Sequence, residues 1–185
     1  MPSNLIIPLA GYGRRFENQG YKTLKPFLPL DQKNKMIDLI ISNFPKDTNK
    51  IFIVRSNLEK KYLDLLKKVK NSKIYFIKPH NNGPLYTLQA IKDKIISMKR
   101  IYVSYCDINW TWAKNKKLNL NYNYVFCYTG YHPFTEDNNH YAFCKVSKSN
   151  ILQVKEKGSF TKKWQKEPLS VGLFYYHNGK ELVES

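Results

Sequence analysis

Residues 5–26 read LIIPLAGYGRRFENQGYKTLKP, an apolar run that passes directly into a turn with two glycines. The run Leu5–Leu9 predicts a buried strand. Gly11 and Gly13 then break the pattern, and such glycines let a turn present several backbone N–H groups to one anion. Positive charge that can neutralise phosphate follows. The basic residues are Arg14, Arg15, Lys22 and Lys25. The stretch therefore predicts a triphosphate-binding turn, although a basic surface turn has the same local pattern.

Two common phosphate-binding motifs are absent from this stretch. The P-loop pattern G-x-x-x-x-G-K-[ST] does not occur in the sequence. The dinucleotide-binding pattern G-x-G-x-x-G fails after Gly13, because no glycine follows at the required spacing.

The first two-thirds of the chain alternates expected strands with expected helices. Strands are expected at Asn4–Leu9, Lys50–Val54, Lys73–Ile77 and Arg100–Tyr105. Helices are expected at Met36–Phe44, at Leu58–Val69 behind a capping box of Ser56 and Glu59, and from Pro84 to about Met98. This order predicts an α/β fold with a mostly parallel, doubly wound sheet, which binds ligands at the carboxyl ends of its strands.

After Asp107 the pattern changes to strands without helices between them. These strands are expected at Tyr124–Tyr128, Ala142–Val146, Ile151–Val154 and Val171–Tyr176. A short helix or loop is expected at 110–117, and a polar, turn-like segment at 130–140. No linker divides the chain, so we expect one domain over 1–185, with a nucleotide-binding part at about 1–110 and an acceptor-binding part at about 111–185.

Composition sets broad limits on the class of protein. The chain has 185 residues, 42% of them hydrophobic, which suits one domain with a core. Its formal net charge of +17 attracts phosphates of many kinds, but the lysines are scattered rather than clustered. Cys106, Cys127 and Cys144 form no C-x-x-C pair and are expected to be small buried hydrophobes. With no signal peptide and no membrane-length apolar run, we expect a cytoplasmic protein.

Asp107 is the first candidate for chemistry outside the glycine turn. It ends an apolar strand, where a carboxylate is costly unless it is paired or bound to a metal. A helix N-cap or turn aspartate is an equally good interpretation of that position. If Asp107 shares a crevice with Arg15 and Lys25, an Mg²⁺ ion that bridges it to phosphates becomes the better explanation.

The other candidates are individually weak. The turn at 81–84 could meet a base or ribose through backbone groups, or be a plain turn before a helix. Lys157 could bind a substrate phosphate, and Glu167 is a second candidate carboxylate for the site. The four histidines show no metal-ligand spacing, and the tryptophans are expected to be packing residues.

Together these segments resemble the sugar-phosphate nucleotidyltransferases, or nucleotide-sugar pyrophosphorylases, in the branch tied to capsule and other surface-glycan synthesis. Gly-x-Gly-x-Arg with the downstream Lys-Pro carries most of the resemblance. The matching blocks are 7–16, 20–27, 83–88, 104–107, 128–133, 141–143, 156–161 and 167–172. They cover nearly the whole chain in the family's order.

The resemblance implies a nucleotide-diphospho-sugar transferase fold, which is Rossmann-like, with a mixed sheet flanked by helices. It implies transfer of a nucleoside monophosphate from an NTP to a phosphorylated acceptor, with release of pyrophosphate. Implied catalytic residues are Arg15 and Lys25, which neutralise phosphates, and Asp107, which holds Mg²⁺. Nucleotide binding is implied for Leu9, Ala10, Gly11, Gly13, Arg14, Asn82 and Gly83. Acceptor binding is implied for Tyr128, Lys157, Glu167 and Gly172. Implied partners are the NTP and a small phosphorylated acceptor, with neither nucleic acid nor membrane, and a homodimer is possible.

Three departures from the family pattern stand out. Leu24 replaces the usual proline before Lys25, and Tyr105-Cys106 replaces a more polar approach to Asp107. Relatives commonly continue beyond the position of Ser185 with a region that brings a second metal carboxylate. We therefore expect a chain shortened at its C-terminus, with the second ligand supplied elsewhere or the activity impaired.

Three other classes of protein remain open. A glycosyltransferase of the same fold would also place an aspartate after this strand, but usually within Asp-x-Asp, whereas this chain has Asp107-Ile108-Asn109. A non-catalytic relative that binds a nucleotide or phosphometabolite is the next alternative. A nucleic-acid-binding protein is the last, and it would show a steep salt dependence.

Overall fold

The computed structural model describes residues 2–112, 118–130 and 141–185, except for the side chain of Arg15. The described strands are β1 (Asn4–Pro8), β2 (Asn49–Arg55), β3 (Ser72–Ile77), β4 (Lys99–Ser104), β5 (Tyr124–Tyr128), β6 (Ala142–Ser147), β7 (Asn150–Glu156) and β8 (Leu169–Asn178). The α-helices are α1 (Arg14–Asn18), α2 (Met36–Ser42), α3 (Lys60–Lys67), α4 (Gly83–Gln89), α5 (Lys92–Ile95) and α6 (Gly179–Glu184). Two 3₁₀ turns are η1 (Lys25–Phe27) and η3 (Trp164–Lys166).

The described residues form two compact units. The first contains the residues up to Asn123 together with Phe174–Ser185, and the second runs from Tyr124 to Leu173. Strand β8 passes from the second unit into the first. The predicted division near residue 110 stays a prediction.

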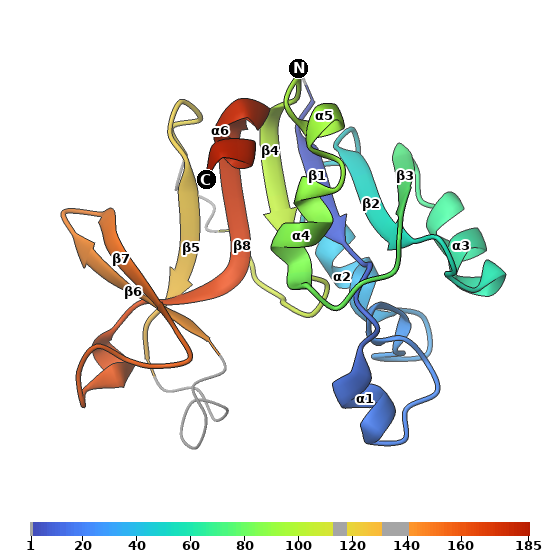
Figure 1. Ribbon diagram of the computed structural model, residues 1–185, viewed down its shortest axis with the longest axis horizontal. Helices are drawn as coiled ribbons and strands as arrows, with labels where there is room; N and C mark the ends of the chain where they lie inside the picture. The colour runs from blue at the N-terminus through green and yellow to red at the C-terminus, as the bar shows by residue number, and fades with distance from the viewer. Residues whose placement is uncertain (1, 113–117, 131–140) are drawn as a thin grey trace. The chain divides into compact units, whose positions relative to one another are not determined.

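A sheet in the order β3-β2-β1-β4-β8 forms the centre of the first unit (Figure 1). β1 pairs in parallel with β2 and β4, and β2 pairs in parallel with β3. Parallel neighbours need a crossover connection, which the segments that carry α2, α3 and α4–α5 provide. The carboxyl ends of β1, β2 and β4 therefore lie at one edge of the sheet. The predicted α/β class with a mostly parallel sheet is confirmed.

Both faces of this sheet are covered, which explains why its strands are nearly continuous apolar runs. Ile6 packs in one cluster with residues from α4, α5 and α6, such as Leu88, Ile95 and Leu182. Its neighbours Leu5 and Ile7 are also fully buried, and successive side chains of a strand point to opposite faces. In Figure 1, α4 and α5 lie in front of β1 and β4.

The second unit contains an antiparallel hairpin of β6 and β7. β6 also pairs antiparallel with the start of β8, where Phe143 lies opposite Leu169. Strands were predicted at all of these positions, and their ends differ from the prediction by only a few residues.

Four local predictions were wrong. The helix expected from Pro84 to Met98 is two helices, because Ile91 leaves helical geometry with a ψ of 23°. The capping box of Ser56 and Glu59 does not form, since α3 begins at Lys60 and its N-cap Glu59 makes no side-chain capping bond. Helices α1 and α6 were not expected. Cys127 is exposed rather than buried, whereas Cys144 is buried as expected.

The missed helix α6 has a signal that the sequence does contain. Asn178 caps it by accepting a hydrogen bond at 3.0 Å from the backbone N–H of Glu181. The pattern of asparagine with an acidic residue three positions later is a known helix start. Within the described part of the chain, no helix has the length and apolar character needed to cross a membrane.

We predict that Gly179→Ala destabilises the protein by about 1–3 kcal/mol, the usual cost of overpacking. A methyl group at Gly179 would lie only 1.8 Å from the backbone oxygen of Ile95, so the packing of α6 on α5 would have to shift. Urea denaturation measures the change. The matched variant Lys180→Ala, at a 71% exposed side chain in the same helix, should change stability by less than about 0.5 kcal/mol. Equal stability of both variants would contradict this packing.

Candidate functional site

The 3₁₀ turn η1, which comes after the glycine turn and α1, meets the segment that follows β4 through an ion pair. The ammonium group of Lys25 donates a hydrogen bond to the carboxylate of Asp107, although the two residues are 82 positions apart. Both side chains are partly exposed, at 27% and 32%. Asp107 lies in a turn, as one interpretation expected, and it is not a helix N-cap, because no described helix begins there. The pairing agrees with the expectation that a carboxylate in this position needs a cationic partner.

The turn itself depends on one glycine in particular. Gly13 has a φ of +70° and forms the N-cap of α1, so a residue with a side chain would be strained there. Its carbonyl oxygen accepts a hydrogen bond from the N–H of Phe16 at 2.9 Å. The chain therefore turns sharply from β1 into α1, and Arg14 and Arg15 follow the turn directly.

A cavity of about 520 Å³ opens beside this turn. One wall is the stretch from Gly11 to Arg14 together with Lys25, and the opposite wall is the start of α4. The predicted nucleotide-binding residues that line it are Gly11, Gly13, Arg14 and Gly83, with the predicted catalytic residue Lys25. Leu9 and Ala10 are buried at the base of the turn, and Asn82 is exposed next to Gly83. The structure thus brings most of the predicted nucleotide-binding residues around one cavity.

The wall formed by α4 is held by a chain of hydrogen bonds through His80. The N–H of Asn82 donates to Nδ1 of His80 at 3.1 Å, so the proton of the neutral ring lies on Nε2. That Nε2 lies 3.1 Å from the hydroxyl of Thr87, which in turn donates to the carbonyl of Gly83 at 3.2 Å. This chain fixes the turn at Gly83, whose φ is +81°. Sequence reasoning considered His80 only as a metal ligand and missed this role.

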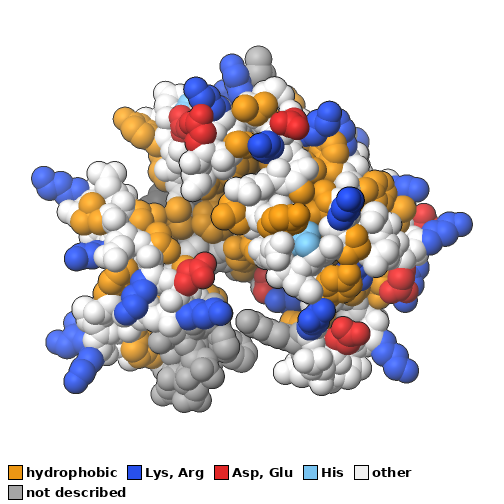
Figure 2. Space-filling view, in the orientation of Figure 1, with side chains coloured by type: hydrophobic (Ala, Val, Ile, Leu, Met, Phe, Trp, Pro, Cys, Tyr) orange, Lys and Arg blue, Asp and Glu red, His pale blue; other side chains and the backbone are white. Residues whose placement is uncertain are grey.

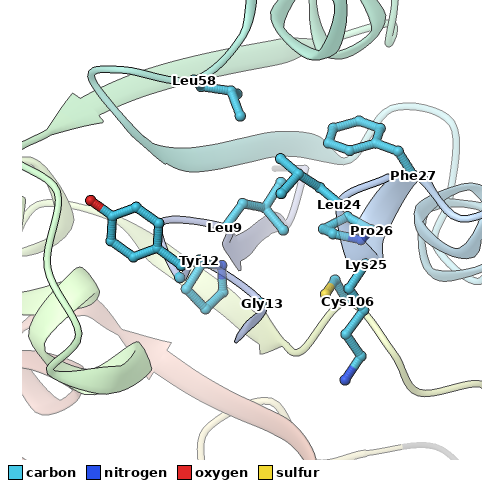
Figure 3. Close-up of a pocket in the computed structure, with 11 residues that line it drawn as sticks. Leu9, Tyr12, Gly13, Leu24, Lys25, Pro26, Phe27, Leu58 and Cys106 are labelled. Atoms are coloured by element: carbon cyan, nitrogen blue, oxygen red, sulfur yellow. The ribbon is translucent and has the colours of Figure 1, made fainter. Parts of the chain in front are cut away.

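A smaller apolar cavity of about 150 Å³ also borders the glycine turn (Figure 3). Leu9, Leu24 and Phe27 line it, with Cys106 and Lys25 at one end. Burial, reinforced by the charge of Asp107, raises the pKa of the Cys106 thiol to about 12. A raised pKa disfavours the thiolate, which is the reactive form of cysteine, so this environment does not favour Cys106 as a nucleophile.

Arg55 is a site residue that sequence reasoning missed. It ends β2 and is only 7% exposed. Its Nη1 donates to the carbonyl of Gly11 at 3.0 Å, and its guanidinium lies 4.8 Å from the centre of the Tyr12 ring. The available signal was a basic residue placed directly after the apolar run of a central strand.

The four predicted acceptor residues all lie in the second unit. Tyr128 is 43% exposed, Lys157 is exposed with a φ of +53°, and Gly172 has a φ of +78°. Glu167 accepts hydrogen bonds from the N–H groups of Phe160 and Thr161 and from the Thr161 hydroxyl, so it holds its own loop together. Burial raises the pKa of Glu167, but these bonds outweigh it and the net pKa is lowered. The acceptor roles stay predictions.

The tryptophans that are described near β4 are packing residues, as predicted. Trp110 and Trp112 pack edge-to-face against each other and against Phe44, which also contacts Tyr102. Lysine and arginine side chains are spread over the visible face rather than gathered on one element (Figure 2). Within the described residues, no group of three His, Cys, Asp or Glu side chains could hold a metal ion without help from a ligand.

No protein-family model and no curated protein matches this chain. Solved structures do match it. A nucleoside-diphosphate-sugar pyrophosphorylase from Vibrio cholerae is 19% identical with a TM-score of 0.71, covering 97% of this chain and 75% of that one. A putative glucose-1-phosphate thymidylyltransferase from Bacillus anthracis is 15% identical with a TM-score of 0.71, covering 98% and 73%.

A third similar structure is a CTP:phosphocholine cytidylyltransferase from Streptococcus pneumoniae. It is 16% identical with a TM-score of 0.69, covering 100% of this chain and 75% of that one. Identities this low establish the fold alone. The fold is that of the nucleotide-sugar pyrophosphorylases and related nucleotidyltransferases, as the sequence predicted.

We predict that Thr87→Val loosens the turn at Gly83 and lowers stability by about 1–3 kcal/mol. The valine has a similar shape but leaves His80 Nε2 and the Gly83 carbonyl without their shared partner. Thr87 is only 2% exposed, so water replaces the hydroxyl poorly. Chemical denaturation of Thr87→Val and Thr87→Ser measures the loss. The serine variant keeps the hydroxyl and should retain most of the stability, and an equal loss in both would exclude the hydrogen-bond chain.

Proposed function

We propose that this protein is a nucleotidyltransferase, which transfers a nucleoside monophosphate from an NTP to a small phosphorylated acceptor and releases pyrophosphate. The single observation that supports it most is the Lys25–Asp107 pair beside the glycine-lined cavity. A cation, a carboxylate and a turn of backbone donors are the groups that phosphoryl transfer needs for positioning and charge neutralisation. The enzymes of the same fold described above are named for this type of reaction.

In the proposed reaction, an oxygen of the acceptor phosphate attacks the α-phosphorus of the NTP. The new P–O bond forms as the bond between the α-phosphorus and the bridging oxygen breaks, and pyrophosphate leaves with that electron pair. Gly11 and Gly13 offer backbone donors to the nucleotide, and the turn at Asn82-Gly83 borders the base. Arg14 and Arg15 follow the glycine turn and neutralise the β- and γ-phosphates.

Lys25 has the most direct role in this proposal. Its ammonium group is occupied by Asp107 in the ligand-free protein, and a triphosphate in the cavity competes for it as a stronger anion. Lys25 would then neutralise the α-phosphate and the incoming acceptor phosphate. This exchange of partners leaves the carboxylate of Asp107 free for another cation.

Magnesium fits this site only as a partner of the nucleotide. Asp107 is one carboxylate beside the cavity, and Mg²⁺ in nucleotide sites is held by one or two carboxylates together with phosphate oxygens and water. When bound, the ion would neutralise charge on the phosphates. Tyr128, Lys157, Glu167 and Gly172 are proposed to bind the acceptor, and a role in capsule or surface-polysaccharide precursor synthesis rests on the resemblance of the sequence blocks.

A direct assay of pyrophosphate release tests the proposed function. The purified protein is incubated with Mg²⁺ and each of CTP, UTP, GTP, dTTP and ATP against sugar phosphates, phosphocholine and phosphorylated amino acids. Release that needs one nucleotide and one acceptor supports a transferase and identifies its substrates. Binding of an NTP with no release for any pair would instead favour a non-catalytic nucleotide-binding protein.

We predict that Lys25→Ala and Asp107→Ala each lower kcat by about 100-fold or more, the usual cost of removing an electrostatic group at a reacting centre. Lys25→Ala should also weaken NTP binding, because it removes a phosphate partner. Both side chains are partly exposed, so circular dichroism should show an intact fold. Lys61→Ala removes one surface charge elsewhere and is the control. Full activity in both variants would exclude this site.

A further inference from the structure

Arg55 carries a charge in a place where charge is costly. It ends β2, a strand paired on both sides, and the three residues before it are fully buried. The residue as a whole has a relative exposure of only 7%. A guanidinium that is removed from water needs a counter-ion or a full set of hydrogen-bond acceptors.

The protein supplies neither in full. No carboxylate among the described residues forms an ion pair with Arg55. Its Nε is buried and has no hydrogen-bond partner within the described part of the chain. The contacts it does make are the hydrogen bond to the Gly11 carbonyl and the stacking on Tyr12. Both contacts are to the glycine turn, and neither compensates a full charge.

These two contacts fix the geometry of the turn. The backbone of β1 is tied to β2 by the N–H of Leu9, which donates to the Ile53 carbonyl at 2.8 Å. Arg55 lies two residues further along β2, and Gly11 lies two residues further along the chain after β1. The side chain of Arg55 therefore continues the link between the two segments beyond the end of the strand pairing.

The orientation of one peptide group follows from this bond. In a trans peptide, the C=O of Gly11 and the N–H of Tyr12 point in opposite directions. Because Arg55 holds the carbonyl, the N–H of Tyr12 is turned away from the guanidinium. The Tyr12 ring is also restrained, since Arg55 and Arg14 lie 4.8 and 5.8 Å from its centre. Gly11, Tyr12 and Gly13 all line the 520 Å³ cavity.

We propose that Arg55 is a positioning residue that locks the glycine turn in its phosphate-binding shape, and that its uncompensated charge favours a polyphosphate in the adjacent cavity. This inference rests on the proposed nucleotide site but not on turnover there. It explains why Arg55 has no ion-pair partner among the described residues, since an anionic ligand in the neighbouring cavity would bring negative charge close to this strand end.

The test compares Arg55→Met with a matched variant of the same strand. Lys50 is also a buried cation in β2, 3% exposed, and its ammonium group donates to the Lys46 carbonyl at 3.0 Å. It lies at the other end of the strand, so Lys50→Met removes a buried charge without touching the turn. Two readouts are used: amide hydrogen exchange at residues 11–13 in the ligand-free protein, and the affinity for inorganic tripolyphosphate.

Arg55→Met should speed exchange at residues 11–13 and weaken tripolyphosphate binding, each by about tenfold or more, as expected for a lost charge-assisted hydrogen bond. Arg55→Lys keeps the charge and one donor. Its amide exchange and its tripolyphosphate affinity should therefore lie between those of Arg55→Met and the wild-type protein. Lys50→Met should change neither. If Arg55→Met does not fold, Tyr12→Leu tests the same contact by removing the aromatic ring on which Arg55 stacks. Tyr12→Phe keeps the ring and is its control.

Unchanged exchange in Arg55→Met, or equal effects in Lys50→Met, would overturn the inference. So would faster exchange with unaltered tripolyphosphate affinity, because the shape of the turn would then be irrelevant to phosphate binding. The two proposals can also fail separately. If the wild-type protein binds tripolyphosphate but no nucleotide tested leads to release of pyrophosphate, the proposed transferase activity is contradicted, whereas the role of Arg55 is not.

Discussion

The parallel pairing of β1 with both β2 and β4 is the constraint on which the rest of the first unit depends. It requires strands that are apolar on both faces, and Leu5, Ile6 and Ile7 are all fully buried. It also brings the carboxyl ends of three strands to one edge. Because of that pairing, Lys25 can reach Asp107 and the backbone after β1 lies beside the end of β2. The chemistry of the site follows from the sheet rather than from any one motif.

The fold was predictable because its signals are periodic and local. The apolar runs of the parallel strands and the amphipathic segments between them predict an α/β sheet with the strands in nearly the observed positions. The missed features depend on particular contacts. Ile91 interrupts a helix whose apolar spacing continues through it. Glu59 is itself the N-cap of α3, rather than the third residue after a cap at Ser56, because α3 begins only at Lys60. Hydrophobic spacing carries no information about either.

The site was predictable in part for the same reason. Gly11 and Gly13 follow β1, and Asp107 follows β4, so the parallel topology brings them to one edge of the sheet. Lys25 lies further along the chain, in η1, and reaches that edge through its ion pair with Asp107. Arg55 and His80 could not be found that way. In the sequence, Arg55 looks like a surface cation at the end of a strand, and His80 looks like an isolated histidine. Their importance comes from bonds to the Gly11 carbonyl and to the turn at Gly83, which only coordinates reveal. Both hold the backbone that surrounds the cavity, from opposite sides.

The most direct measurement is a nuclear magnetic resonance titration of the labelled protein with a magnesium nucleoside triphosphate, followed through backbone amides. We expect the largest shifts at Gly11, Tyr12, Gly13 and Gly83, the backbone that lines the cavity, and little change along the exposed strand β7. Such a pattern would establish a nucleotide site at the carboxyl ends of the parallel strands. Shifts that are absent from the glycine turn, or spread over the scattered surface lysines, would contradict it and indicate nonspecific attraction of phosphate to a basic protein.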